Sequence, residues 1–272
     1  NVQKFRNSYE FNQNDFLIEE IFNRLKIQNG VFVEFGAWDG ILLSNTRKLF
    51  ENGWGGVLIE GDRQKHAELE RNYEQAANVV TVNCLVDTRH NLIDSIFEQH
   101  LDKNIDFCSI DIDGLDLDIF ETFEINLPKV VCIEGGQTLA PYHSRVSSDV
   151  SRNNIQQSLS VMNSVFEAKG YKLLCSYQDS FFIKEEYHKL FNVDESLMNQ
   201  YIDGLLALPR LPYIKKLLAA SGLINEVVEQ AILDIPAAVM SRVMNQGTKE
   251  DKMKWVDDYY LKIKENLNGL KK

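Results

Sequence analysis

Short apolar runs alternate with amphipathic segments along the first 187 residues. Runs rich in Val, Ile and Phe predict strands at 31–35, 56–62, 79–86, 105–114 and 129–136. Between them apolar positions recur every three to four residues, which predicts helices at 16–25, 41–52, 63–77, 90–101 and 115–125. Strands joined by helical crossovers favour a parallel sheet with helices on both faces.

The pattern changes after the fifth predicted strand. Residues 137–153 are polar and irregular, and a long helix then presents Ile155, Leu159, Met162 and Phe166 on one face before Gly170. Two further β-like runs, 171–177 and 180–183, are close enough to form a hairpin, so one of them must be antiparallel. We therefore expect an α/β, Rossmann-like fold with seven mostly parallel strands.

The last 85 residues have a different composition from the rest. Three of the five prolines lie in 188–272, where helical periodicity dominates. The predicted organisation is one domain over 1–187, with its N-terminal helix, and a helical C-terminal region over 188–272. This region is a candidate surface for homo-oligomer formation or for docking within a longer parent chain.

A glycine turn follows the first strand, in the sequence VFVEFGAWDG at 31–40. A strand, a glycine turn and a helix bring backbone N–H groups close to a ligand, so this turn predicts a nucleotide-type cofactor site near Gly36. The dinucleotide fingerprint G-x-G-x-x-G fails because Trp38 stands at its second glycine. The alternative is a tight turn that binds nothing.

Acidic residues end the other predicted strands. Glu60 ends the second strand, where a carboxylate can accept both hydroxyls of a ribose, and Asp87 follows the third, where it could meet an adenine amino group. Asp111 and Asp113 end the fourth strand and Glu134 ends the fifth. These three carboxylates predict either a divalent cation site or a general base. The alternative is that Asp111 contacts the cofactor while its neighbours cap a helix.

Basic residues and a histidine lie in the irregular segment. His143 follows the carboxyl edge of the sheet and is a second candidate base. Arg145 and Arg152 could hold an anionic part of a substrate.

Charge and composition narrow the partners. Residues 188–272 hold 12 Lys+Arg and 11 Asp+Glu, a balance of +1, so the net charge of −11 places −12 on the first 187 residues. An acidic domain argues against a nucleic-acid partner and favours a small acceptor.

No apolar run approaches the ~20 residues that span a bilayer. Cys84, Cys108, Cys132 and Cys175 have no C-x-x-C spacing, which favours free thiols and a cytoplasmic location. The start at Asn1 favours a processed product, a trimmed chain or a piece of a longer protein.

Five motifs together carry a family resemblance over about residues 31–187. They are VEFGAWDG at 33–40, LIEGD at 58–62, IDFCSIDIDG at 105–114, VVCIEGG at 130–136 and the ending GYKLL followed by DSFFIKEEY. The chain resembles class I S-adenosylmethionine-dependent methyltransferases, and within them the FkbM-type family. Family relatives commonly have glutamate where Asp113 stands.

The resemblance implies a set of donor contacts. They are Glu34, Gly36, Asp39, Gly40, Ser44 and Asn45 around the methionine and ribose, Glu60 on the ribose and Asp111 near the methionine end.

The expected function is transfer of a methyl group from S-adenosylmethionine to a hydroxyl of a small polar acceptor, such as a sugar or a polysaccharide-biosynthesis intermediate. Candidate proton acceptors are Asp113, Glu134 and His143. A Mg²⁺ or Mn²⁺ ion on Asp111, Asp113 and Glu134 is an alternative means of activating the hydroxyl. The competing hypothesis is a non-catalytic, methyltransferase-like binding module of a larger assembly.

Overall fold

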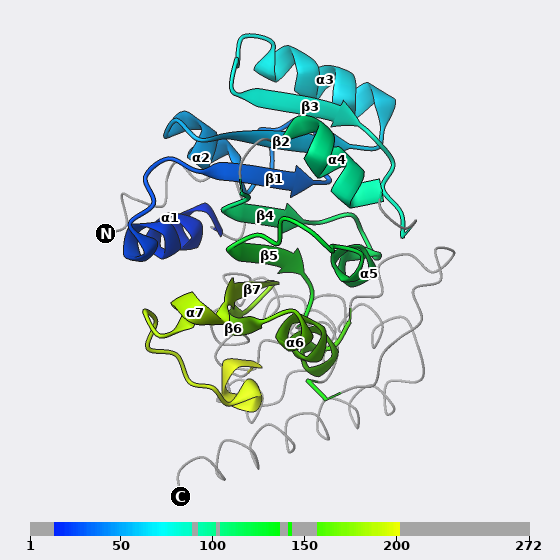
Figure 1. The fold of residues 1–272 in the computed structure, drawn as a ribbon. Helices are drawn as coiled ribbons and strands as arrows, with labels where there is room; N and C mark the ends of the chain where they lie inside the picture. The colour runs from blue at the N-terminus through cyan, green and yellow to red at the C-terminus, as the bar shows by residue number, and fades with distance from the viewer. Residues whose placement is uncertain (1–13, 89–91, 102–103, 137–140, 143–156, 202–272) are drawn as a thin grey trace, which may run out of the picture.

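A seven-stranded sheet organises the protein. The structure is a computed structural model that describes residues 14–88, 92–101, 104–136, 141–142 and 157–201. The strands follow the order β3-β2-β1-β4-β5-β7-β6 across the sheet (Figure 1). They are β1 Val31–Phe35, β2 Gly55–Glu60, β3 Val79–Asn83, β4 Phe107–Ile110, β5 Val130–Glu134, β6 Tyr171–Ser176 and β7 Asp179–Lys184.

The strand directions match the predicted fold class. Neighbouring strands from β3 to β5 pair in parallel, and β7 is antiparallel to both β5 and β6. The prediction of a mostly parallel, Rossmann-like sheet with a terminal antiparallel pair is confirmed. Residues 202–272, which make up most of the predicted helical C-terminal region, lie outside the described residues.

Helices cover both faces of the sheet. Helices α1 Asn14–Leu25, α2 Arg47–Glu51 and α3 Arg63–Tyr73 pack on one face, in a cluster that includes Phe22, Leu49 and Leu69. Helices α4 Leu92–His100, α5 Asp116–Glu121 and α6 Leu159–Ala168 pack on the other. There Phe166 stacks between Phe120 and Phe182, with ring centroids 3.8 and 3.7 Å apart. The short helix α7 Glu185–His188 follows β7 and spans the predicted domain boundary, which stays a prediction.

One predicted helix is wrong in its first half. The expected helix over 41–52 is only α2 Arg47–Glu51, and residues 41–46 form a loop. The hydroxyls of Ser44 and Thr46 donate hydrogen bonds to Glu34 on β1, and these bonds hold the segment in a non-helical conformation. The carboxyl end of β1 is therefore followed by a loop rather than directly by a helix N-terminus.

The order of strands locates the switch point of the sheet. β1 lies between β2 and β4, so the chain proceeds outward from β1 in both directions. Open α/β sheets bind ligands outside the carboxyl ends of the strands at such a switch point. Here those ends are followed by Gly36 after β1 and Asp111 after β4.

Two other expectations concern the chain as a whole. Within the described ranges, no helix combines the length and apolarity that crossing a bilayer requires. None of the four cysteines Cys84, Cys108, Cys132 and Cys175 takes part in a disulfide in the structure.

The close approach of the backbone at the ends of β1 and β4 leads to a prediction about Gly36. Its φ is +73°, and a Cβ there would lie 1.8 Å from the carbonyl oxygen of Asp111. Gly170 has a similar φ of +81° but no atom within 4 Å of the same position. We expect Gly170→Ala to lower the free energy of unfolding by about 1–2 kcal/mol, from the backbone alone. Gly36→Ala should cost clearly more in urea denaturation, and equal losses would contradict the tight approach of β1 to β4.

Candidate functional site

A buried carboxylate on β1 anchors the loop that follows this strand. Glu34 is 4% exposed. One of its carboxylate oxygens accepts hydrogen bonds from the hydroxyls of Ser44 and Thr46, at 2.8 and 2.6 Å. The other accepts one from the backbone N–H of Asn45, at 2.7 Å. Glu34 thus fixes the position of residues 44–46 against the sheet.

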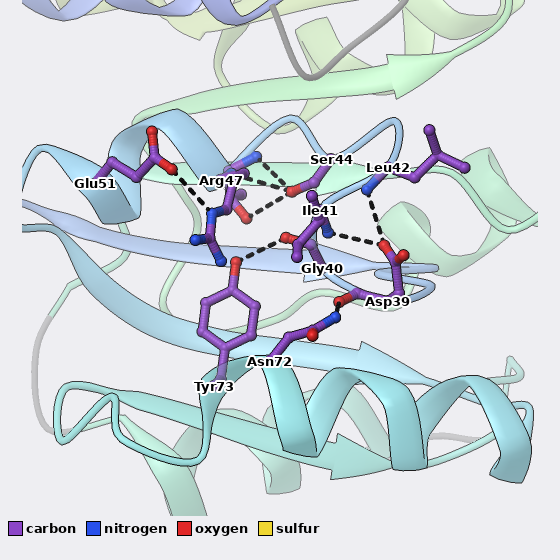
Figure 2. A network of polar contacts seen from close by, with 10 residues as sticks. Asp39, Gly40, Ile41, Leu42, Ser44, Arg47, Glu51, Asn72 and Tyr73 are labelled. Atoms are coloured by element: carbon purple, nitrogen blue, oxygen red, sulfur yellow. Dashed lines mark hydrogen bonds and ion pairs between the residues drawn. The ribbon is translucent and has the colours of Figure 1, made fainter.

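The same loop is held from its other side by α3. Asp39 accepts hydrogen bonds from the backbone N–H groups of Ile41 and Leu42, at 2.9 and 2.8 Å. From α3, Asn72 and Tyr73 donate to the backbone carbonyls of Asp39 and Gly40, both at 2.8 Å (Figure 2). The Asp39 carboxylate therefore stabilises the turn itself, in addition to any contact with a ligand.

Arg47 fastens the start of α2 beside this loop. Its backbone N–H donates to the Ser44 hydroxyl at 3.0 Å, and its guanidinium contacts Glu51 at 3.2 Å (Figure 2). The hydroxyl of Ser44 therefore links Glu34 on the sheet to the first turn of α2.

Glu60 is placed at the end of β2, as predicted. Its side chain is 9% exposed, and its two carboxylate oxygens accept from the backbone N–H groups of Trp38 and Asp62, at 2.8 and 2.7 Å. Each oxygen retains a second lone pair that can accept from a hydroxyl. Glu60 thus joins the turn after β1 to the start of α3 at the carboxyl end of β2.

Three carboxylates meet at the ends of β4 and β5. The carboxylate groups of Asp111, Asp113 and Glu134 each offer an oxygen within 4.8 Å of the others. Asp111 and Asp113 are exposed and Glu134 is partly buried. The predicted convergence of these strand ends is therefore present in the structure. Oxygen donors at this spacing could hold a hard divalent cation, or share a proton.

The electrostatics of this cluster favour protonation of one member. Burial raises the pKa of Glu134 well above its usual range, and the negative charges of Asp111, Asp116 and Asp179 add to the effect. The pKa of Asp111 is also raised, first because protein atoms crowd its carboxylate, although the residue as a whole is exposed, and then because of the Asp113 charge. Two like charges at this distance resist ionising together, so Glu134 is the member that keeps a proton.

Asp116 stabilises the turn that carries Asp113. It is 2% exposed and accepts from the backbone N–H groups of Ile112 and Gly114, at 2.8 and 2.9 Å. Burial raises its pKa to about 7, against the lowering effect of those bonds. Asp116 holds the turn that carries Asp113, whose φ of 61° is left-handed.

The remaining predicted residues divide into three groups. Ser44 and Asn45 are buried, and the Asn45 amide donates to Ser109 on β4 at 2.9 Å. Asp87 is partly buried and follows β3. His143, Arg145 and Arg152 lie outside the described residues.

The sequence interpretation missed several residues of the site. Thr46 and Ser109 complete the contacts of Glu34 and Asn45, and Asp179 pairs with Glu134 across β5 and β7. The run Ser44-Asn45-Thr46 was the available signal, because consecutive short polar residues compete with helix formation. Asp179 had no local signal, since its neighbour is 45 residues away in the chain.

The comparisons with known proteins concern the fold. No family model matches the chain, and no curated protein matches it. Among solved structures, the chain is similar to the METTL16 MTase domain, with 15% identity, a TM-score of 0.41, and coverage of 63% of this chain and 65% of that one. It is also similar to the N-terminal domain of EvdMO1 with SAH bound, at 10% identity and a TM-score of 0.43, over 62% and 78% of the two chains.

A third solved structure matches over a longer range. M. capricolum TrmK in complex with S-adenosyl-homocysteine covers 92% of this chain and 96% of its own, at 10% identity and a TM-score of 0.44. At this level of similarity, the assignment of the fold depends on the sheet order itself. The chain spans just under two thirds of the METTL16 domain, and the FkbM-type resemblance stays a prediction from its motifs.

The anchoring of the loop by Glu34 predicts a pH dependence of stability. Burial raises the pKa of Glu34 from 4.5 to about 7, despite the bonds from Thr46, Ser44 and Asn45. Between these pH values the unfolded chain ionises this group while the folded protein keeps its proton. The stability that Glu34 contributes is therefore full below pH 4.5 and falls by up to about 3 kcal/mol as the pH rises to 7.

The test compares urea denaturation at pH 4.5 and 8 for the wild type and Glu34→Gln. The variant should lose about 3 kcal/mol less over this interval, because glutamine stays neutral. Glu20→Gln is the matched control, since Glu20 is about half exposed on α1. An identical pH slope in the wild type and Glu34→Gln would contradict the account.

Proposed function

We propose that this protein transfers a methyl group from S-adenosylmethionine to a hydroxyl of a small polar acceptor. The observation that carries the proposal is the meeting of three features at the switch point of the sheet. A glycine turn follows β1, the acid Glu60 ends β2, and the carboxylates Asp111, Asp113 and Glu134 end β4 and β5. These features would give a nucleoside donor and a proton acceptor adjacent places.

Each part of the donor has a candidate partner. Glu60 would accept the ribose hydroxyls, because its oxygens already lie at the crevice and are oriented by two backbone N–H groups. Asp111 would lie near the methionine end, beside Gly36. Glu34 would act chiefly by holding the Ser44–Asn45 segment that borders the same end.

The sulfonium of the donor supplies an already electrophilic methyl group, so the protein mainly has to orient the acceptor. Asp113 or Glu134 would take the proton from the acceptor hydroxyl as the new C–O bond forms. Glu134 could act as this base only in its ionised form, because its raised pKa keeps the carboxyl group protonated near neutral pH. His143 stays a candidate base.

We place the acceptor among sugars and polysaccharide-biosynthesis intermediates, and the reaction in the cytoplasm. Three carboxylates lie together at the ends of β4 and β5, and four cysteines without a disulfide fit a reducing compartment. The dense negative charge disfavours a nucleic-acid backbone. Arg145 and Arg152 would hold an anionic group of the acceptor.

The donor prediction is tested by calorimetric titration with S-adenosylhomocysteine. The wild type should bind, and Glu60→Gln should bind at least about 10-fold more weakly, because bonds to a charged acceptor contribute about 1.5–3 kcal/mol. Glu70→Gln on α3 is the control, since its side chain is 60% exposed. Absence of binding by the wild type would instead support the non-catalytic module.

The metal alternative has a separate test. If a divalent cation activates the hydroxyl, a chelator should abolish methyl transfer and added Mg²⁺ or Mn²⁺ should restore it. If the carboxylates act as a base, transfer should survive the chelator, and Asp113→Asn should reduce it by about 100-fold or more. Transfer that resists both the chelator and Asp113→Asn would exclude Asp113 from either role.

A further inference from the structure

Trp38 occupies a backbone position that does not favour it. The backbone N–H of Gly40 donates to the carbonyl of Ala37 at 2.7 Å, which closes a four-residue turn with Trp38 as its second residue. The φ of Trp38 is 50°, in the left-handed region where glycine carries no steric penalty. Bulky residues rarely adopt this conformation, so an outlier here points to a function for the side chain.

The indole ring is exposed but its position is restrained. Although Trp38 is 49% exposed, its backbone N–H donates to Glu60 at 2.8 Å. The Nζ of Lys65 lies 4.5 Å from the ring centroid, in a cation–π contact. The carboxylate of Asp62 accepts from the backbone N–H of Lys65 at 2.9 Å and so fixes the start of α3. The ring is thus held next to the end of β2.

A second exposed apolar side chain lies on the other side of that strand end. Leu85 follows β3 and is 79% exposed. A Cβ on Gly61 would lie 3.0 Å from the Cδ1 atom of Leu85, so Leu85 packs directly on the residue after Glu60. Since β2 lies between β1 and β3, Trp38 and Leu85 reach the end of β2 from the loops that follow both neighbouring strands.

We propose that Trp38 is a binding residue whose indole forms an aromatic wall for the purine of the nucleoside donor, with Leu85 opposite. The proposal rests on the proposed function, because the ribose on Glu60 is what brings the base between these side chains. A base has an apolar face that stacks on an aromatic ring, and both surfaces lose water when they meet. The unfavourable backbone of Trp38 is retained because the stacking requires the ring there.

The test exploits opposite expected effects on stability and binding. Trp38→Gly removes the steric cost of the left-handed conformation, so it should raise the melting temperature. The same change should weaken the binding of S-adenosylhomocysteine by about 10-fold or more in calorimetry. Lys26→Gly is the matched control, because Lys26 has a φ of 58° and lies before β1, at the opposite edge of the sheet. It should raise the melting temperature and leave the affinity unchanged.

Two further variants guard against a change in folding. Trp38→Phe keeps an aromatic face and should bind the same ligand within a few-fold of the wild type, and Leu85→Ala should weaken it several-fold. Trp38→Gly that binds as tightly as the wild type, or more tightly, would overturn the inference, and tighter binding would mean that the indole obstructs the crevice. Should the wild type itself fail to bind, the proposed function falls first, and the inference falls with it.

Discussion

One buried ionisable side chain on β1, Glu34, determines the position of the loop that follows this strand at the carboxyl edge of the sheet. Glu34 accepts three hydrogen bonds from Ser44, Asn45 and Thr46, and these bonds offset the cost of removing a carboxyl group from water. In return they hold the loop across the sheet and delay α2 to Arg47. The backbone N–H of Trp38 in this loop donates to Glu60, and the side chains of Trp38, Leu42 and Leu43 are exposed.

The fold holds several carboxylates close together at the ends of β4 and β5, where their negative charges repel one another. Parallel strands bring Asp111, Asp113 and Glu134 within 4.8 Å, and Asp116 fixes the turn between them through two backbone bonds. So many carboxylates can coexist only if a proton, a cation or a positively charged ligand reduces their repulsion. A sulfonium cofactor and a hydroxyl acceptor that gives up a proton both fit this requirement.

The sequence predicted those features that depend on regular repetition. Strands such as Val31–Phe35 are apolar runs bounded by glycine, so their existence and their order along the chain could be predicted directly. The convergence of acids at the ends of β4 and β5 could be predicted in the same way. The start of α2 could not, because Ile41 and Leu42 continue a helical pattern that the distant Glu34 interrupts. The left-handed Trp38 likewise depends on Glu60, 22 residues further along the chain. Contacts between distant residues therefore override local preference at the site.

A crystal structure of the protein with S-adenosylhomocysteine tests the central claim most directly, since it locates the ligand relative to both acids. The account predicts ribose hydroxyls within hydrogen-bond distance of the Glu60 carboxylate, and a Glu34 carboxylate still bonded to Ser44, Asn45 and Thr46. A ligand bound away from the ends of β1 and β4, or a Glu34 side chain that leaves this loop to contact the ligand, would contradict it.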